Sequence, residues 1–257
     1  MKIKSAWTRQ IESGQQPSSS SLRDHLDAVH DNNAGFTEAF AWNCRDANGK
    51  NSYELLADIV DQKNHSHVLD LGCGSGVLLD LCNRRFGAEL MLSGVDMNGS
   101  ELQLARERLS KTDTKFHQGT AQNLDCFADS SFDVIFCHWA LTLMDPVAEV
   151  LATTMRLLKE RGIFAAIIDG DPKTAPGYLE VHDIIYKHVQ CKYPDYGVFE
   201  LGDPRVRTAA GLQKLTAETF ENFDINITPI TLSFNAAPSV LAHEAAGFFY
   251  ASFVLSP

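Results

Sequence analysis

Two aspartates in this chain each stand near the end of an apolar stretch, where a side chain could contact a bound ligand. Asp70 is followed by glycines at 72, 74 and 76, and Asp96 follows Gly76 by twenty residues. The apolar stretches predict strands, and the residues between them predict a helix. A strand, a glycine turn, a helix and a second strand with a terminal acid make up the adenosine-binding unit of many open α/β sheets.

The spacing of the glycines distinguishes between cofactors. The dinucleotide fingerprint requires Gly or Ala at the position that Val77 occupies here. Asp70 would also bring a carboxylate close to the two negative phosphates of a dinucleotide. A carboxylate there suits a ligand with an ammonium group and a sulfonium, which predicts S-adenosylmethionine. The alternative is a tight turn whose glycines satisfy only backbone geometry.

The glycine turn and its two acids resemble those of the class I S-adenosylmethionine-dependent methyltransferases, in particular the small-molecule enzymes related to the ubiquinone and biotin pathways. The resemblance extends over about residues 52–257. It implies a Rossmann-like, doubly wound α/β fold: a mostly parallel seven-stranded sheet with an antiparallel C-terminal strand and a helical lid. The helix start after Gly76 also favours the carboxylate of the ligand.

The resemblance further implies a set of cofactor contacts. Asp70 would bind the methionine ammonium, Asp96 both ribose hydroxyls, and Met97 the adenine face. The full set is Asp70, Gly72, Cys73, Gly74, Gly76, Asp96, Met97, Ala121, Gln122 and Cys137.

Methyl transfer mainly requires alignment of the acceptor and exclusion of water, and a base helps only if the acceptor is a hydroxyl or an amine. The resemblance places the residues just after the fourth strand beside the sulfonium, so His138 is the first candidate for a catalytic base or an acceptor ligand. A hydrogen-bonded structural histidine is the alternative. The chain lacks an Asn/Asp-Pro-Pro-Tyr/Phe tetrapeptide here, which argues against methylation of nucleic-acid bases or glutamine amides.

Strands and helices alternate through the middle of the chain. Strands are expected near 67–71, 90–96, 115–118, 132–138 and 163–169, and helices near 76–85, 99–110 and 146–160. This alternation predicts a parallel sheet with helices on both faces. Two further strands, at 225–234 and 247–255, are expected to form a terminal hairpin.

The remaining segments predict a division of the chain. We expect a helical N-terminal cap in residues 1–50, of which about the first 20 are loosely attached, and a cofactor-binding domain in residues 51–257. Residues 171–207 form an insertion that suits a lid over the acceptor. The candidate acceptor contacts are Phe36, Trp42, Tyr53, Trp139, His182 and Tyr186. The alternative is that the N-terminal aromatic residues only cover the sheet and that the lid residues face solvent.

The overall charge argues against nucleic acid as a partner. The chain has 33 acids and 22 bases, a net charge of −11, and its bases do not cluster. Six cysteines without a C-x-x-C pair indicate reduced thiols, and no metal-ligand spacing is present. The N-terminus lacks the apolar segment of a signal peptide, and no stretch suits a membrane span, so a cytoplasmic protein is expected. No feature predicts an oligomeric state.

Together these features predict a methyltransferase that acts on a small molecule. Two alternatives stay open: a non-catalytic subunit that binds S-adenosylmethionine, and a protein or peptide methyltransferase. The long insertion disfavours the second, because a protein substrate needs an open docking surface. A nicotinamide-dependent oxidoreductase is disfavoured by Asp70 and Val77.

Overall fold

The fold centres on a parallel sheet whose strand order reverses in the middle. The computed structural model describes residues 5–170, 172–175, 177–192, 194, 202–220 and 224–248. Within these residues, one five-stranded sheet has the order β3-β2-β1-β4-β5, with every pair parallel. The strands are β1 (His67–Leu71), β2 (Met91–Asp96), β3 (Lys115–Gln118), β4 (Phe132–His138) and β5 (Leu158–Ile167). The order reverses between β1 and β4, and ligands of such sheets bind at the carboxyl ends of the strands at that point.

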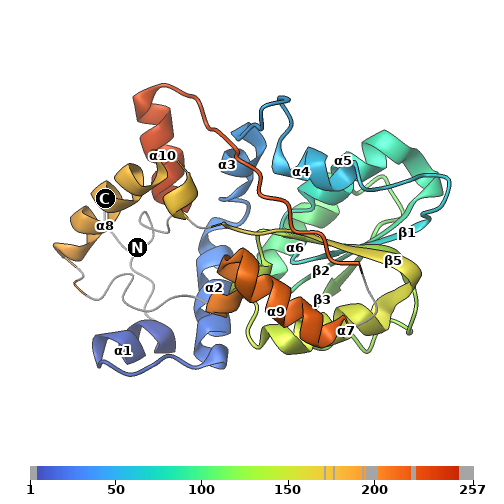
Figure 1. The fold of residues 1–257 in the computed structure, drawn as a ribbon, viewed down its shortest axis with the longest axis horizontal. Coiled ribbons are helices and arrows are strands. Elements are labelled where there is room, and N and C mark those ends of the chain that lie inside the picture. Colours follow the sequence, from blue (N-terminus) through green and yellow to red (C-terminus); the bar gives the residue numbers. More distant parts are fainter. Residues whose placement is uncertain are drawn as a thin grey trace.

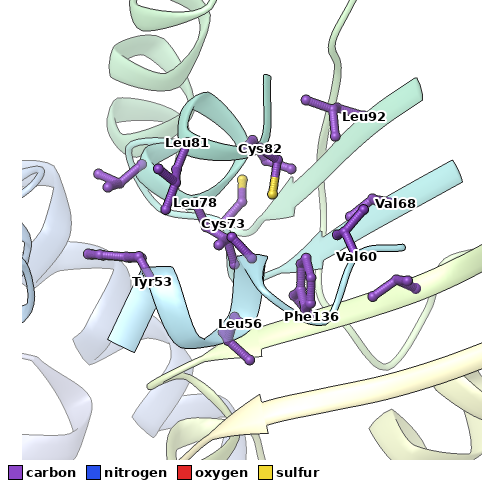
Figure 2. Close-up of a cluster of buried hydrophobic side chains, with 14 of the residues drawn as sticks. Tyr53, Leu56, Val60, Val68, Cys73, Leu78, Leu81, Cys82, Leu92 and Phe136 are labelled. Atoms are coloured by element: carbon purple, nitrogen blue, oxygen red, sulfur yellow. The ribbon is translucent and has the colours of Figure 1, made fainter. Parts of the chain in front are cut away.

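Helices cover both faces of the sheet (Figure 1). On one face lie α4 (Ser52–Ala57), α5 (Val77–Phe86) and α6 (Gly99–Arg108), and on the other lie α7 (Val147–Leu157) and α9 (Ala209–Thr219). Figure 2 shows the first core, in which Leu78 of α5 and Leu56 of α4 lie among strand residues such as Phe136. Because β1 and β4 have helices on both sides, their residues are almost continuously buried.

The chain begins with a helical region. It consists of α1 (Ala6–Glu12), α2 (Ser19–Asn33) and α3 (Glu38–Asn43). The expectation that the first residues attach loosely is wrong for the described part: the Trp7 ring of α1 stacks on the His25 ring of α2, with centroids 4.6 Å apart. Aromatic stacking of this kind adds to the apolar area that the contact buries.

The remaining helices lie after the sheet in sequence. They are α8 (Tyr178–Gln190) and α10 (Pro238–Phe248). Short 3-10 turns lie between strands at Gly87–Glu89 and Leu141–Leu143, and after β5 at Pro172–Thr174 and Pro204–Arg207. In Figure 1, α8 and α10 lie on the opposite side of α2 and α3 from the sheet. Within the described ranges, no helix combines the length and apolar character needed to cross a lipid bilayer.

The fifth strand begins earlier than the sequence predicts. The helix expected to extend to residue 160 ends at Leu157, and β5 starts at Leu158, which pairs with Phe132. Leu158 is buried in the second core, so packing against the sheet outweighs the helical pattern of its neighbours. The four other central strands match their expected positions within one residue.

The expected C-terminal hairpin is not confirmed. Residues 225–234 form no strand of the sheet; Ser233 makes only an isolated antiparallel bridge with Arg45. Pro229 has no N–H to donate to a ladder, and Ile225 and Ile230 stay 40% and 46% exposed instead of packing into the core. Of the second expected strand, residues 247–248 end α10 and the rest lies outside the described residues. The seven-stranded sheet is thus reduced to five strands in the described part of the chain.

Candidate active site

The glycine turn after β1 has a backbone shape that only glycine adopts readily. Gly72, Gly74 and Gly76 have φ angles of +69°, +49° and +78°. A Cβ atom on Gly72 would also lie 2.7 Å from the Cβ of Ala140, in the loop after β4. The turn is fixed to β2, because the N–H groups of Gly72 and Cys73 donate to the carbonyl of Val95, at 2.8 and 2.9 Å.

Asp70 lies at the carboxyl end of β1 and is almost completely buried. Its Oδ1 is out of contact with water and has no hydrogen-bond partner. Burial and the negative charge of Asp96 raise the pKa of the Asp70 carboxyl well above its usual value. A buried carboxylate oxygen without a donor is unfavourable, so this position suits a cationic donor such as an ammonium group.

Asp96 binds the glycine turn and its own loop. Its Oδ2 accepts a hydrogen bond from the Gly74 N–H at 2.8 Å, and its Oδ1 accepts one from the Asn98 N–H at 2.9 Å. Burial raises the pKa of the Asp96 carboxyl, while these two hydrogen bonds act in the opposite direction. A carboxylate can accept about four hydrogen bonds, so Asp96 can still accept bonds from a ligand such as a ribose diol.

The adenine contacts implied by the resemblance occupy neighbouring loops. The carbonyl of Met97 accepts a hydrogen bond from the Gln118 side chain at 3.1 Å, which joins the loops after β2 and β3. Ala121 is buried in the second core, and the carbonyl of Gln122 accepts a hydrogen bond from the Thr153 hydroxyl at 2.8 Å. Cys137, near the end of β4, is fully buried in the same core. Burial and the charge of Asp70 raise the pKa of its thiol.

Helix α2 spans the carboxyl edge of the sheet. Near its start, the Ser19 hydroxyl donates to the carboxylate of Asp145, in the loop after β4. Near its end, the side-chain amide of Asn98, in the loop after β2, donates to Asp27 and Asp31 at 2.9 Å each. The helix therefore connects the two loops that flank the glycine turn.

The segment after α2 contacts the glycine turn directly. Glu38 at the start of α3 accepts hydrogen bonds from the Ser75 hydroxyl and from the Arg108 guanidinium, all at 2.8 Å. We call residues 19–38, with these contacts, the N-terminal clasp. The polar residues of the clasp could not be predicted from the sequence, which pointed only to aromatic residues of this region as site contacts.

His138, the candidate base, ends β4 in a hydrogen-bonded and stacked position. Its Nε2 lies 2.7 Å from the Ser52 hydroxyl oxygen, and its ring stacks on Tyr53 with centroids 4.1 Å apart. Burial lowers the pKa of the imidazole to about 3, so the ring is neutral at physiological pH. A group with so low a pKa is a weak base, and this geometry favours an orienting role.

Aromatic side chains extend from His138 to the N-terminal helices. Tyr53 lies next to Trp42, and Trp139 next to Phe40, with ring centroids 6.3 Å apart in both pairs. Trp139 has a φ of +51°, which is rare for a bulky residue and characteristic of functional sites. We call these four residues the aromatic wall. The ring of Phe36, the other N-terminal candidate, lies next to the His30 ring, with centroids 5.1 Å apart.

The lid candidates lie on α8. The rings of His182 and Tyr186 stack on each other with centroids 3.8 Å apart. Burial and the charge of Asp169, which follows β5, raise the pKa of Tyr178 at the start of α8. In the part of the chain that the structure describes, no three His, Cys, Asp or Glu residues are arranged to hold a metal ion.

Comparisons with known proteins point to methyltransferases. Residues 62–180 match the family model of a methyltransferase domain. A demethylmenaquinone methyltransferase of Leptospira interrogans is 34% identical over 114 residues, which cover 42% of this chain and 45% of the relative. A demethylmenaquinone methyltransferase of Listeria monocytogenes is 28% identical over 137 residues, which cover 52% of this chain and 56% of the relative. The chain thus spans about half the length of the curated relatives it matches.

Among solved structures, the YcgJ protein of Bacillus subtilis has 21% identity and a TM-score of 0.49, over 65% of this chain and 67% of that protein. A geranyl diphosphate C-methyltransferase of Streptomyces coelicolor has 15% identity and a TM-score of 0.48, over 65% and 58%. The family match includes the glycine turn and both site acids. Residues 62–180 thus match a methyltransferase domain, and the relatives that match this chain are methyltransferases.

Proposed function

We propose that this chain transfers a methyl group from S-adenosylmethionine to a small-molecule acceptor. The observation that carries the proposal is the arrangement of two acids around one glycine turn, Asp70 fully buried and Asp96 partly buried. Asp96 accepts a hydrogen bond from Gly74, and Asp70 presents a buried oxygen without a partner. The first arrangement suits a hydroxyl-bearing ligand, and the second suits a cation.

The proposed roles of the cofactor-binding residues are those that the resemblance implies. Asp70 binds the ammonium group, the backbone from Gly72 to Gly74 approaches the methionine end, and Gly76 begins the helix that faces the carboxylate. Asp96 accepts hydrogen bonding from the ribose. Met97, Ala121 and Gln122 surround the adenine, and Cys137 lies at the methionine end. When bound, the cofactor supplies a methyl carbon activated by a sulfonium.

The chain itself contributes orientation and exclusion of water, which can together account for about 7–11 kcal/mol of a barrier. Helix α2 covers the carboxyl edge and thereby keeps solvent from the transferred group. Neutral His138, held by Ser52 and Tyr53, orients the acceptor through hydrogen bonding and does not remove its proton.

The aromatic wall favours an acceptor with an apolar, planar portion. Phe40, Trp42 and Trp139 are only partly buried, and an apolar planar group placed beside them would contact aromatic rings. Demethylmenaquinone, the substrate in the names of the relatives, is an acceptor of this kind. We propose that the cap in residues 1–50 and a lid in residues 171–207, with His182 and Tyr186, enclose the acceptor beside the domain of residues 51–257. A reducing compartment such as the cytoplasm suits the six free cysteines.

A calorimetric titration of the purified chain with S-adenosylmethionine, S-adenosylhomocysteine and NADH tests the proposal. Micromolar binding of the two sulfur ligands and none of NADH is expected. A methyltransferase assay with quinol and phenol acceptors then tests turnover. Failure of both sulfur ligands to bind would overturn the proposal, and binding without turnover on any acceptor would favour a non-catalytic subunit.

A further inference from the structure

Glu101 is a buried acid that the cofactor contacts described above do not use. It lies in the first turn of α6, five residues after Asp96, and is only 3% exposed. Its Oε1 lies 2.7 Å from Nδ1 of His30 and accepts a hydrogen bond from the Gly35 N–H at 2.9 Å. Its Oε2 is out of contact with water and has no hydrogen-bond partner.

The unpartnered oxygen faces the glycine turn. A Cβ atom built on Gly74 would lie 3.7 Å from Glu101 Oε2, so this oxygen lies close to the backbone of the glycine. The N–H of Gly74 already donates to Asp96, and those of Gly72 and Cys73 donate to Val95. The turn therefore has no N–H group left for Glu101 among these three residues.

A buried acceptor without a donor costs free energy, and such oxygens in native proteins call for an explanation. Asp70 offers a similar oxygen at the end of β1, where a cation is expected. Glu101 instead lies beside Asp96, whose carboxyl has its pKa raised in part by the charge of Glu101. The two carboxylates approach the same residue, Gly74, from the β2 side of the turn.

We infer that Glu101 is a further cofactor-binding residue: its Oε2 accepts a hydrogen bond from one ribose hydroxyl, while Asp96 accepts the other. This inference rests on the proposed function. A ribose diol carries two O–H donors, which matches two adjacent carboxylates. The donor reaches Oε2 when the 30–35 segment of the N-terminal clasp moves, and Oε1 holds that segment in place once the cofactor is bound. Glu101 thus connects cofactor binding to closure of the clasp.

Calorimetric titrations with S-adenosylhomocysteine and its 2′-deoxy and 3′-deoxy analogues test this role. Glu101→Gln and Glu101→Ala are expected to lower the affinity for S-adenosylhomocysteine about 10- to 100-fold, as for loss of a hydrogen bond to a charged group. For the analogue that lacks the hydroxyl bound by Glu101, wild type and variants should bind nearly equally. Glu107→Gln, an equal charge change at an exposed position of the same helix, is the control and should leave affinity unchanged.

Two results would overturn the inference. One is unchanged affinity in both Glu101 variants. The other is an equal loss for S-adenosylhomocysteine and both deoxy analogues, in variants whose thermal unfolding matches that of the wild type, because the loss would then not depend on a hydroxyl. If the wild type itself binds none of these ligands, the proposed function fails as well, so the two failures are distinguishable.

Discussion

The amide nitrogen of Gly74 lies 2.8 Å from Oδ2 of Asp96, so the turn after β1 is bound to the acid that ends β2. The two residues are separated by helix α5 in the sequence, and parallel pairing of β1 with β2 brings them together. The hydrogen bond fixes the carboxylate at the carboxyl edge of the sheet before any ligand arrives. A preorganised acceptor of this kind lowers the cost of ordering on binding.

Replacing Asp96 by alanine should therefore weaken cofactor binding. Loss of charge-assisted hydrogen bonds predicts a decrease of about 1.5–3 kcal/mol in binding free energy, measured by calorimetric titration with S-adenosylhomocysteine. Asp129→Ala is a suitable control, because the side chain of Asp129 is 74% exposed and pairs with Arg156. Equal affinity of wild type and Asp96→Ala would rule out the ribose assignment.

Asp70→Asn keeps the shape of the buried side chain but removes its ability to ionise. It therefore tests both the stability lost when this carboxyl is buried and its role in cofactor binding. The pKa of Asp70 is raised in the folded chain, so the folded state holds a proton that the unfolded state releases above about pH 4. The wild type should thus lose stability relative to Asp70→Asn as the pH rises from about 4 toward the folded-state pKa. Urea denaturation between pH 4 and 7 measures this difference.

The same substitution should reduce binding of S-adenosylmethionine, because an amide does not neutralise an ammonium group. Added S-adenosylmethionine is expected to raise the melting temperature of the wild type more than that of Asp70→Asn. A difference in unfolding free energy that stays constant with pH, or an equal ligand-induced shift, would contradict the role given to Asp70.

The sequence was sufficient to predict the central sheet and the glycine turn. Apolar runs bounded by glycines and acids mark β1, β2 and β4, because strands covered on both faces must be apolar throughout. The glycine turn was recognisable because three closely spaced glycines indicate a backbone that other residues adopt poorly. All three have positive φ angles in the structure. These features are local in the sequence, and the structure has them where they were expected.

The polar contacts of the clasp were beyond the reach of sequence patterns. His30 and Glu101 lie 71 positions apart, as do Asp27 and Asn98. Neither pair belongs to a periodic or spaced motif, and each residue alone reads as part of a solvated helix face. In residues 225–234, by contrast, a sequence pattern predicts a strand that the structure lacks. Their apolar residues suggest a strand, but within the described residues this segment does not pair with the sheet.

The neutral His138 predicts a pH dependence of stability. Its pKa is lowered from 6.5 to about 3 in the folded chain, so only the unfolded state takes up a proton between these values. Stability from this group is complete above pH 6.5 and decreases as the pH falls toward 3, by at most about 1.4 kcal/mol per pH unit.

Urea denaturation of the wild type and His138→Gln between pH 7 and 4.5 checks this. Burial lowers the pKa of His25 to about 4, so His25 also makes the unfolding free energy fall with decreasing pH, equally in both proteins. The difference in unfolding free energy between the two proteins therefore reports on His138 alone. A difference that does not change with pH would show that His138 takes up a proton as readily in the folded chain as in the unfolded one, so that burial does not lower its pKa.

Glu38→Gln should loosen the clasp and leave the fold intact. The ion pair of Glu38 with Arg108 is partly exposed, with side chains 32% and 27% accessible, so its loss should cost no more than about 1 kcal/mol of stability. Since Glu38 also accepts a hydrogen bond from Ser75 in the glycine turn, we expect S-adenosylhomocysteine to dissociate severalfold faster.

Stopped-flow displacement measures this rate. Asp58→Asn removes exposed pairs with Lys50 and Arg85 elsewhere on the surface and serves as the control. Equal dissociation rates in the wild type and Glu38→Gln would mean that the clasp does not hold the cofactor.

Gly72→Ala tests the steric requirement of the turn, and Gly177→Ala supplies a reference. The φ angles of Gly72 and Gly177 are +69° and +79°, but a Cβ on Gly177 meets no atom within 4 Å, whereas one on Gly72 lies 2.7 Å from the Cβ of Ala140. Gly177→Ala should cost about 1–2 kcal/mol for the left-handed backbone alone. Gly72→Ala should cost about 1–3 kcal/mol more, because the turn and the loop after β4 must move apart.

Adding Ala140→Gly to Gly72→Ala removes the clashing methyl group and should recover most of this excess in urea denaturation. If the double variant is no more stable than Gly72→Ala, contact with Ala140 does not limit the residue at position 72.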